Sequence, residues 1–330
     1  MRIAVMGDTL CRAKDGGDPF SFVRPLWGKA DVRLLNLEAV LSNQGTPAPK
    51  RTRLRTDPAN VAYLAGVDVV HLANNHTLDY GAVGCVDTLE ALHRQGIRSA
   101  GVGCGATPWT PVFVGGIAVL AFHAYPLSDG RYCMAHLEDE RALRTVRDLV
   151  DYVETVVVSL HWGTEHAPHP SPAQIQQARA FIDAGAALVV GHGPHRLQPI
   201  ERYKDGLIAY SLGNFNLWHT DVRERGYNRQ TAILFADLDG RRVTGYDLHP
   251  LAISDNGCPV PLAQYLEHAH RPEMTQAEWY KEIGGRYVVD SLRSLLWTIP
   301  RYGWPRVRKL VWWLRQRHTW RAIKGMLQCV

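Results

Sequence analysis

Short apolar runs, each followed by a polar side chain, alternate with helical patterns along the first two thirds of this chain. The runs at residues 2–6, 31–37 and 67–73 are too short for typical helices and rich in Val, Ile and Leu, so they predict buried strands. Residues 57–65 and 81–95 carry helix signals, and a glycine follows each of them. This alternation of strand and helix is typical of an α/β fold.

The pattern becomes strand-rich after about residue 195. Strands are predicted at 117–122, 155–163 and 186–195, and helices at 137–150 and 172–184. Four short apolar runs with glycine-containing turns between them follow at 197–203, 207–212, 230–238 and 242–249. This order predicts α/β layers with a mixed sheet and an added β layer.

The composition is that of a globular protein and excludes several other classes. Of the 330 residues, 46% are hydrophobic and 21% are charged, which argues against a wholly disordered or collagen-like chain. The chain contains no run of 18 uncharged apolar residues, and its apolar start is too short for a signal peptide. The six cysteines form no C-x-x-C pair, which favours free thiols. We therefore expect a cytoplasmic protein without a spanning helix.

The composition changes sharply toward the C-terminal end. From Arg286 onward there are ten Lys and Arg residues and one acidic residue, Asp290, together with five of the ten tryptophans. We predict a large domain at 1–262 and a basic, Trp-rich helical extension at 263–330. The pattern at 305–328 fits a helix lying on the inner membrane surface, and it fits equally a helical cap packed on the domain or on a partner chain. A nucleic-acid partner is not expected, because no nucleic-acid-binding fold accompanies the charge.

Side chains that can bind metal ions follow one predicted strand after another. They are Asp8, Glu38, Asn75, His76, His161, His192 and His195. Ligands in open α/β sheets bind beyond the carboxyl ends of the strands, so we expect these side chains to meet at one sheet edge. Oxygen and imidazole ligands without thiolate suit Mn, Fe or Zn, and a carboxylate can bridge two ions. One or two divalent or trivalent transition-metal ions are therefore the expected cofactor.

Six motifs in order along the chain carry a resemblance to a known family. They are Gly7-Asp8; Asn36-Leu37-Glu38; Ala73-Asn74-Asn75-His76 with Asp79 and Gly81; His161-Trp162-Gly163 with Glu165; Gly191-His192-Gly193-Pro194-His195 with Gln198 and Glu201; and Tyr210-Ser211-Leu212-Gly213-Asn214-Phe215. From about residue 2 to about residue 262, the chain is similar to the CapA-type family. That family is associated with poly-γ-glutamate capsule biosynthesis and belongs to the calcineurin-like metallophosphoesterase superfamily.

The resemblance implies a four-layer α/β/β/α sandwich with a two-metal site at the sheet edge. The ligands that it implies are Asp8 on the first strand, Glu38 in the bridging position, Asn75 as the amide ligand, His161, and the final pair His192 and His195. The chain departs from the superfamily pattern at Leu10, where a histidine ligand is usual. It also departs at the bridging residue, where Glu replaces Asp, and at the final pair, where His-x-x-His replaces His-x-His.

The resemblance makes His76 the acid beside the amide ligand, and metal-assisted hydrolysis is the mechanism that we expect. In this hypothesis a metal-activated water attacks the substrate, and His76 donates a proton to the leaving oxygen. Asp79, three residues later, either orients His76 or is a turn residue. Glu165 and His166 either line the pocket or form hydrogen bonds with the ligand histidines.

Basic residues indicate an anionic substrate. Arg51, Arg53 and Arg55 alternate, so their guanidinium groups can face one side and bind phosphate or carboxylate groups. A solvated edge strand is the alternative. A second basic group and the turn residue before it are further candidates: Asn214, Arg223, Arg225 and Arg229.

These inferences predict a metal-dependent hydrolase of the CapA-like type that acts on a phosphoester or polyanionic substrate. Two alternatives keep the fold: an amide-bond enzyme or accessory factor in poly-γ-glutamate or natural-product biosynthesis, and a non-catalytic, membrane-associated scaffold. A cysteine nucleophile is not expected, because no Cys-Gly motif begins a helix. Gly101-Val102-Gly103 is too short for a dinucleotide-binding loop.

Overall fold

The computed structural model describes residues 1–137, 140–217 and 229–261. The predicted helical extension at 263–330 lies outside the described residues. The predicted domain boundary near residue 262 therefore stays a prediction.

The chain divides into two compact units. One unit is formed by Met1–Pro47 and Leu54–Pro272, and the other by Ala48–Arg53 and Glu273–Val330. The helices, the strands and the candidate site that follow all belong to the first unit.

Eight of the described strands form the first sheet. Across the sheet they are β18 (Pro259–Pro261), β17 (Arg242–Ile253), β16 (Gln230–Asp239), β1 (Arg2–Thr9), β2 (Val32–Leu37), β5 (Val69–His71) and β6 (Arg98–Ala100), with β15 (Asn214–Asn216) paired to β1. β1, β2, β5 and β6 run parallel, and β16 to β18 continue the sheet in antiparallel fashion. The carboxyl ends of the parallel strands therefore share one edge.

A second sheet contains six strands within the described ranges. In order they are β13 (Ile200–Tyr203), β14 (Gly206–Ala209), β12 (Leu188–His192), β11 (Thr155–His161), β9 (Ile117–His123) and β8 (Val112–Val114). β14, β12, β11 and β9 are parallel. Two short pairs lie outside both sheets: β3 (Val40–Leu41) with β4 (Arg55–Thr56), and β7 (Val102–Gly103) with β10 (Cys133–Met134).

Helices form at the four positions that the sequence predicts, and the structure adds the short α1 and η2, which the sequence analysis did not predict. The α-helices are α1 (Arg24–Trp27), α2 (Gly81–Arg94), α3 (Glu140–Leu149) and α4 (Pro172–Asp183), and the 3₁₀ helices are η1 (Pro58–Leu64) and η2 (Thr107–Trp109). α4 begins with a capping box, in which the Ser171 hydroxyl accepts from the Gln174 N–H and the Gln174 side chain accepts from the Ser171 N–H. The predicted helix at 57–65 is the short η1, with Asp57 capping its first turn.

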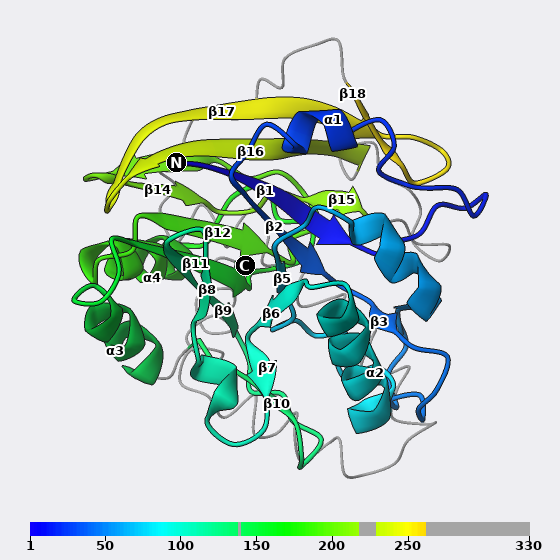
Figure 1. Ribbon diagram of the computed structural model, residues 1–330. Coiled ribbons are helices and arrows are strands. Elements are labelled where there is room, and N and C mark those ends of the chain that lie inside the picture. The colour runs from blue at the N-terminus through cyan, green and yellow to red at the C-terminus, as the bar shows by residue number, and fades with distance from the viewer. Residues whose placement is uncertain (138–139, 218–228, 262–330) are drawn as a thin grey trace, which may run out of the picture. The chain divides into compact units, whose positions relative to one another are not determined.

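Successive residues of the strands face opposite layers. On β1, Ile3 and Val5 pack in a core shared with β9, β11 and β12, so this core lies between the two sheets. Ala4 and Met6 point the other way and pack with residues of α1, η1 and α2. In the second sheet, Leu120 and its outward neighbours pack against α3 and α4. The four-layer α/β/β/α sandwich is therefore confirmed (Figure 1).

The strand-rich segment does not form a layer of its own, which corrects one expectation. β13 and β14 extend the second sheet, and β15 to β18 join the first. The pairing of β16 with β1, in which Ile3 lies opposite Ala236, continues the first sheet beyond β1 and covers that edge. Both β layers are consequently mixed sheets.

Candidate metal centre

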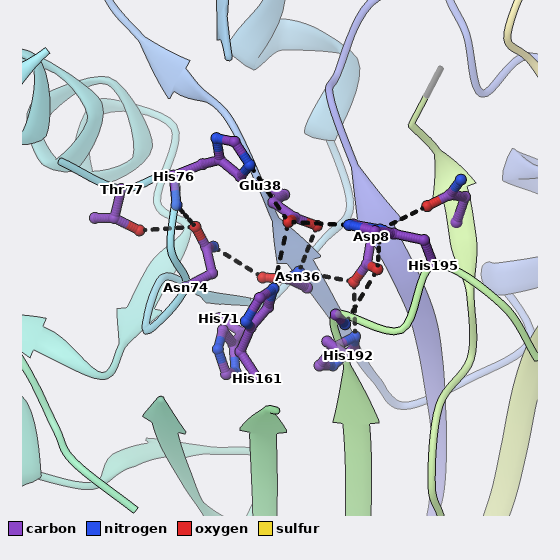
Figure 2. Close-up of polar contacts among 12 residues, drawn as sticks. Asp8, Asn36, Glu38, His71, Asn74, His76, Thr77, His161, His192 and His195 are labelled. Atoms are coloured by element: carbon purple, nitrogen blue, oxygen red, sulfur yellow. Dashed lines mark hydrogen bonds and ion pairs between the residues drawn. The ribbon is translucent and has the colours of Figure 1, made fainter. Parts of the chain in front are cut away.

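The ends of parallel strands from both sheets meet at one place, as Figure 2 shows. Asp8 lies near the end of β1, and Glu38 directly follows β2. His161 and His192 are the last residues of β11 and β12, and they are partners in the register of these strands. His195 follows in the loop after β12. These are the strand-end positions at which α/β sheets place ligands.

A tight crossing between two backbone segments sets the position of Asp8. A Cβ atom on Gly7 would lie 2.1 Å from the carbonyl oxygen of Gly213, so only glycine fits there. The Asp8 N–H donates to the same carbonyl at 2.9 Å. In the register of β1 and β15, Asp8 lies opposite Asn214. The crossing therefore places the Gly213 turn beside the candidate site.

Two carboxylates and one histidine form the most compact part of the site. Asp8, Glu38 and His195 each offer a ligand atom, and these three atoms all lie within 4.8 Å of one another. His195 Nδ1 lies 3.0 Å from Asp8 Oδ2, and His195 Nε2 lies 3.7 Å from Glu38 Oε1. Both carboxylates are fully buried. A group of carboxylate and imidazole donors this close together matches the ligand set of a transition-metal ion.

Two further histidines reach the same oxygen of Glu38. His161 Nε2 lies 3.3 Å from Glu38 Oε1, and His76 Nε2 lies 3.9 Å from it. His161 comes from the second sheet, whereas Glu38 and His76 follow strands of the first. Glu38 is thus one of the residues through which side chains from the two sheets come into contact.

Both members of the final histidine pair face Asp8. His192 Nδ1 lies 3.4 Å from Asp8 Oδ1, on the opposite carboxylate oxygen from His195. The wider His-x-x-His spacing is accommodated because Gly193 has a φ of 102° and His195 a φ of 56°, both in the left-handed region. A Cβ atom on Gly193 would lie 3.0 Å from His161 Cε1.

Two asparagine side chains form a hydrogen-bonded chain that begins at the two carboxylates. The Asn36 side-chain N–H donates to Asp8 Oδ1 at 2.8 Å and to Glu38 Oε2 at 3.4 Å. Asn74 in turn donates to Asn36 Oδ1 at 2.9 Å, and its own oxygen accepts the His76 N–H at 3.0 Å. This chain of hydrogen bonds links the carboxylates to the loop that carries His76 (Figure 2).

The structure shows the surroundings of Asn75, the predicted amide ligand, and of Leu10, which stands where a histidine ligand is usual. Asn75 is half-buried and its side-chain oxygen is fully buried, whereas the neighbouring Asn74 supplies the hydrogen-bonded amide described above. Leu10, which stands where the superfamily has a histidine, is buried in a small apolar cluster with Leu54 and Leu217. The first strand therefore contributes one ligand candidate, Asp8.

The contact predicted between Asp79 and His76 is present. The Asp79 Oδ2 atom lies 2.7 Å from His76 Nδ1 and also accepts the Leu54 N–H at 2.6 Å. A carboxylate can only accept, so His76 donates from Nδ1 and turns Nε2 toward Glu38. Asp79 is fully buried, which limits the freedom of this pair.

Burial and mutual charge shift the pKa values of the cluster in opposite directions. Burial raises the pKa of Glu38 to about 7. Burial alone would raise the pKa of Asp8 as well, but hydrogen bonds with His192 and His195 hold it well below its usual range. Burial lowers the pKa of His161 to about 3. For His195 the effect of burial is outweighed by the carboxylates of Glu38 and Asp8, which raise its pKa to about 10.

The residues present fit a bound cation. Two carboxylates are fully buried side by side, and the basic side chains that contact them in the described part of the chain are histidines, of which burial keeps His161 neutral. Buried carboxylates in this arrangement are costly unless a charge compensates them. The Nε2 atom of His192 is buried and accepts or donates no hydrogen bond within the described ranges. This nitrogen is therefore available as a ligand.

The structure adds two histidines that the sequence reasoning missed. His123 ends β9 in register with His161, and their ring centroids lie 5.4 Å apart. His71 ends β5, and its ring centroid lies 5.4 Å from that of His192. The strand-end rule that selected the other histidines could have found His123. His71 was hidden inside the apolar run at 67–73.

The predicted substrate-binding residues fall into two groups. Asn214 Oδ1 lies 3.0 Å from His195 Nδ1, and the ring centroid of His166 lies 6.2 Å from that of His195. Glu165 is close enough for its charge to affect the pKa values of Glu38, His161 and His195. These three candidates therefore lie at the site.

The arginine candidates are arranged differently. The Arg55 guanidinium lies 4.8 Å from the centre of the Tyr80 ring. Arg53 Nη1 donates to the Ala48 and Lys50 carbonyls of its own loop, and Arg51 and Arg53 belong to the second compact unit. Arg229 pairs with Asp255, and Arg223 and Arg225 lie outside the described residues.

No helix in the part of the chain that the structure describes is both long enough and apolar enough to cross a bilayer.

The chain is similar in sequence to several capsule-related proteins. It is 29% identical over 260 residues to PGA biosynthesis protein CapA of Bacillus subtilis, which covers 74% of this chain and 67% of that protein. It is 32% identical over 227 residues to capsule biosynthesis protein CapA of Bacillus anthracis, covering 62% of this chain and 52% of that protein. A probable polyglutamine synthesis accessory protein of Mycobacterium tuberculosis is 31% identical over 221 residues, covering 57% and 58%. The chain thus spans from about half to two thirds of the length of these relatives.

The fold is shared with a solved structure of much lower sequence similarity. A crystal structure of a hypothetical protein from Thermus thermophilus matches with a TM-score of 0.50 and 17% identity, covering 76% of this chain and 98% of that chain. The model of the family described as bacterial capsule synthesis protein PGA_cap matches residues 2–217, the segment that contains all the strand-end residues above. Since this match spans well over half of the sequence, the chain belongs to the PGA_cap family of bacterial capsule synthesis proteins.

Proposed function

We propose that this protein is a metal-dependent hydrolase that acts on a phosphoester or on another polyanionic substrate. The observation that supports the proposal is the convergence of Asp8, Glu38 and His195 within 4.8 Å, with His161 and His76 directed at the same carboxylate. In this proposal the cluster at the ends of the parallel strands both binds the metal and forms the active site.

One or two transition-metal ions such as Mn, Fe or Zn would be held by residues from both sheets. The ligands would be Asp8, Glu38, Asn75, His161, His192 and His195. When bound, such ions polarise a substrate oxygen and lower the pKa of water. Asn36 keeps the two carboxylates in place through its side-chain N–H, so the ligand set is organised before a substrate arrives.

His76 is the residue proposed to protonate the leaving group. Its Nδ1 donates to Asp79, which fixes the ring, and its Nε2 faces the carboxylate centre. A proton held at Nε2 is then directed toward the place where the leaving oxygen develops charge. Asp79 acts through His76, with which it forms this hydrogen bond.

Substrate recognition is assigned to the rim of the same site. Asn214 and His166 both lie next to His195, and both carry polar atoms that could bind an oxyanion. Arg55 is exposed in the same compact unit as the site and carries a charge suited to phosphate or carboxylate groups. Glu165 adds negative charge near the site. This charge favours binding of a metal cation and disfavours binding of an anion when no metal is present.

A panel assay on the purified protein tests this proposal. Bound metal is measured first, and hydrolysis of generic phosphoesters and of γ-glutamyl peptides is then followed with added Mn²⁺, Fe²⁺ or Zn²⁺. Activity is expected to vanish in chelator and in His161→Ala, and to persist in His93→Ala, an exposed histidine on α2. Metal-free protein whose activity is unchanged by chelator would contradict the proposal.

The second candidate is an amide-bond enzyme or accessory factor in poly-γ-glutamate biosynthesis. The names of the relatives favour it, since they refer to PGA and capsule biosynthesis and to polyglutamine synthesis. The same panel separates the two candidates. Turnover of γ-glutamyl peptides without turnover of phosphoesters would favour amide chemistry.

A further inference from the structure

His71 lies beneath the candidate metal centre, between the two sheets. It is the last residue of β5 in the first sheet, and no part of it is exposed. Its Nδ1 atom lies 2.8 Å from the hydroxyl of Ser159 on β11, a strand of the second sheet. One side chain therefore bridges the two β layers directly under the site.

Both ring nitrogens of His71 have defined hydrogen bonds. Nε2 lies 3.0 Å from the carbonyl oxygen of Ala73, which can only accept, so Nε2 carries a hydrogen. Nδ1 of the neutral ring is then left to accept the Ser159 hydroxyl hydrogen. Burial holds the pKa of His71 well below its usual range, in agreement with a neutral ring.

The two partners of His71 belong to the two halves of the ligand set. Ala73 directly precedes the loop Asn74-Asn75-His76, which carries the predicted amide ligand and acid. Ser159 lies two residues before His161 on the same strand, so both side chains project from the same face of the sheet. The His71 ring also lies 5.4 Å from the His192 ring and 6.4 Å from the His161 ring, measured between centroids.

We propose that His71 is a positioning residue that fixes the loop ligands of the first sheet relative to the histidine ligands of the second. The Ser159 bond holds it to β11, the Ala73 bond holds it to the loop, and its ring packs against two candidate ligands. The inference rests on the proposed function, because it concerns the metal centre on which that function depends.

Binding of Mn²⁺ to the full chain tests the inference, with calorimetry giving the affinity and the stoichiometry. His71→Phe keeps a ring of similar size and removes both hydrogen bonds, and Ser159→Ala removes only the bond between the sheets. Loss of a residue that orients ligands typically weakens metal binding about 10- to 100-fold. We expect His71→Phe to weaken Mn²⁺ binding about tenfold or more, and Ser159→Ala to weaken it by a smaller factor.

The matched control is Thr155→Val at the opposite end of the same strand. Thr155 is buried and its hydroxyl donates to the Gly240 carbonyl, so this variant also loses one buried hydrogen bond. It should melt at a lower temperature while binding Mn²⁺ like the unmodified protein. In the metal-free proteins, amide exchange at 73–76 should speed up in Ser159→Ala and stay unchanged in Thr155→Val.

A double variant supplies a further check. If Ser159 acts through His71, then Ser159→Ala should add little to the loss already caused by His71→Phe. Should His71→Phe fail to fold, Ser159→Ala carries the comparison with Thr155→Val. Equal Mn²⁺ affinity in Ser159→Ala and in the unmodified protein would overturn the inference, as would equal weakening in Thr155→Val. Failure of the unmodified protein to bind Mn²⁺ would instead overturn the proposed function.

Discussion

At the scale of single residues, His76 and Asp79 form the pair proposed to control proton transfer to the leaving group. General acid catalysis typically contributes 10²- to 10⁴-fold. We expect His76→Gln to lower kcat about 100-fold or more on esters with alkyl leaving groups, which need a proton to depart. Asp79→Asn should give a smaller loss with the same dependence on the leaving group. Rates measured across a series of leaving groups check this.

The leaving-group series has an internal control. The p-nitrophenolate leaving group is a weak base and departs from its ester without a proton. The His76→Gln variant should therefore hydrolyse a p-nitrophenyl ester at nearly the rate of the unmodified protein. An equal loss on every ester would show that His76 holds the site together and does not donate a proton.

The charges of Glu38 and His195 predict how metal binding depends on pH. A pKa raised to about 7 for Glu38 and to about 10 for His195 means that both groups hold protons in slightly acidic solution. Ligands must be deprotonated, so a metal ion has to displace these protons. Mn²⁺ affinity should therefore rise from pH 6 to pH 8, with protons released on binding. Calorimetry in buffers of different ionisation enthalpy measures the released protons, and a flat profile would contradict the ligand assignment.

At the scale of elements, the crossing of β1 with the Gly213 turn supports the site. A methyl group on Gly7 would lie 2.1 Å from a backbone oxygen, which cannot move without moving the turn. We expect Gly7→Ala to destabilise the fold by about 1–3 kcal/mol, the usual range for overpacking, and to weaken metal binding. Thermal unfolding with and without Mn²⁺ measures both effects.

Gly28→Ala is the matched control for that variant. Gly28 has ordinary helical backbone angles, and a Cβ atom there would lie 3.4 Å from its nearest neighbour, the carbonyl oxygen of Arg24. It should leave stability and metal affinity nearly unchanged. Equal stability of Gly7→Ala and Gly28→Ala would show that the crossing does not constrain Asp8.

The strand ends were the part of the site that the sequence could predict. Asp8, Glu38 and His161 each lie at the end of a short, mainly apolar run, and parallel strands bring such positions to one edge. Periodicity within one run does not tell which strand of the facing sheet lies opposite. For that reason the contact of His71 with Ser159 could not be predicted.

The same limit explains why the sequence could not predict how the β layers are built or which contacts the arginines make. Local turn signals predicted strands at 230–249 correctly but could not show that they pair with β1. Alternation suggested that Arg51, Arg53 and Arg55 face one side, yet Arg53 bonds to the carbonyls of its own loop. A pattern of alternating residues does not show which backbone carbonyls will accept hydrogen bonds from a side chain.

At the scale of the whole molecule, the basic segment at 286–330 gives the chain a charge asymmetry suited to an anionic surface. Each Lys or Arg near such a membrane contributes about 1 kcal/mol. Replacing Arg306, Arg308, Arg315 and Arg317 by Gln should weaken binding of the full chain to phosphatidylserine vesicles at least about tenfold. Co-sedimentation checks this, with neutral vesicles and high salt as controls. Equal binding of both proteins would rule out the membrane contact and favour a packed cap.

The proposed function requires that residues from both sheets hold a common cation. Anomalous X-ray diffraction from crystals grown with Mn²⁺ tests it most directly. We expect an anomalous peak at coordination distance from Asp8, Glu38 and His195, with His161 or His192 completing the ligand set from the second sheet. Peaks confined to surface carboxylates, or a peak that persists unchanged in Glu38→Ala, would contradict it.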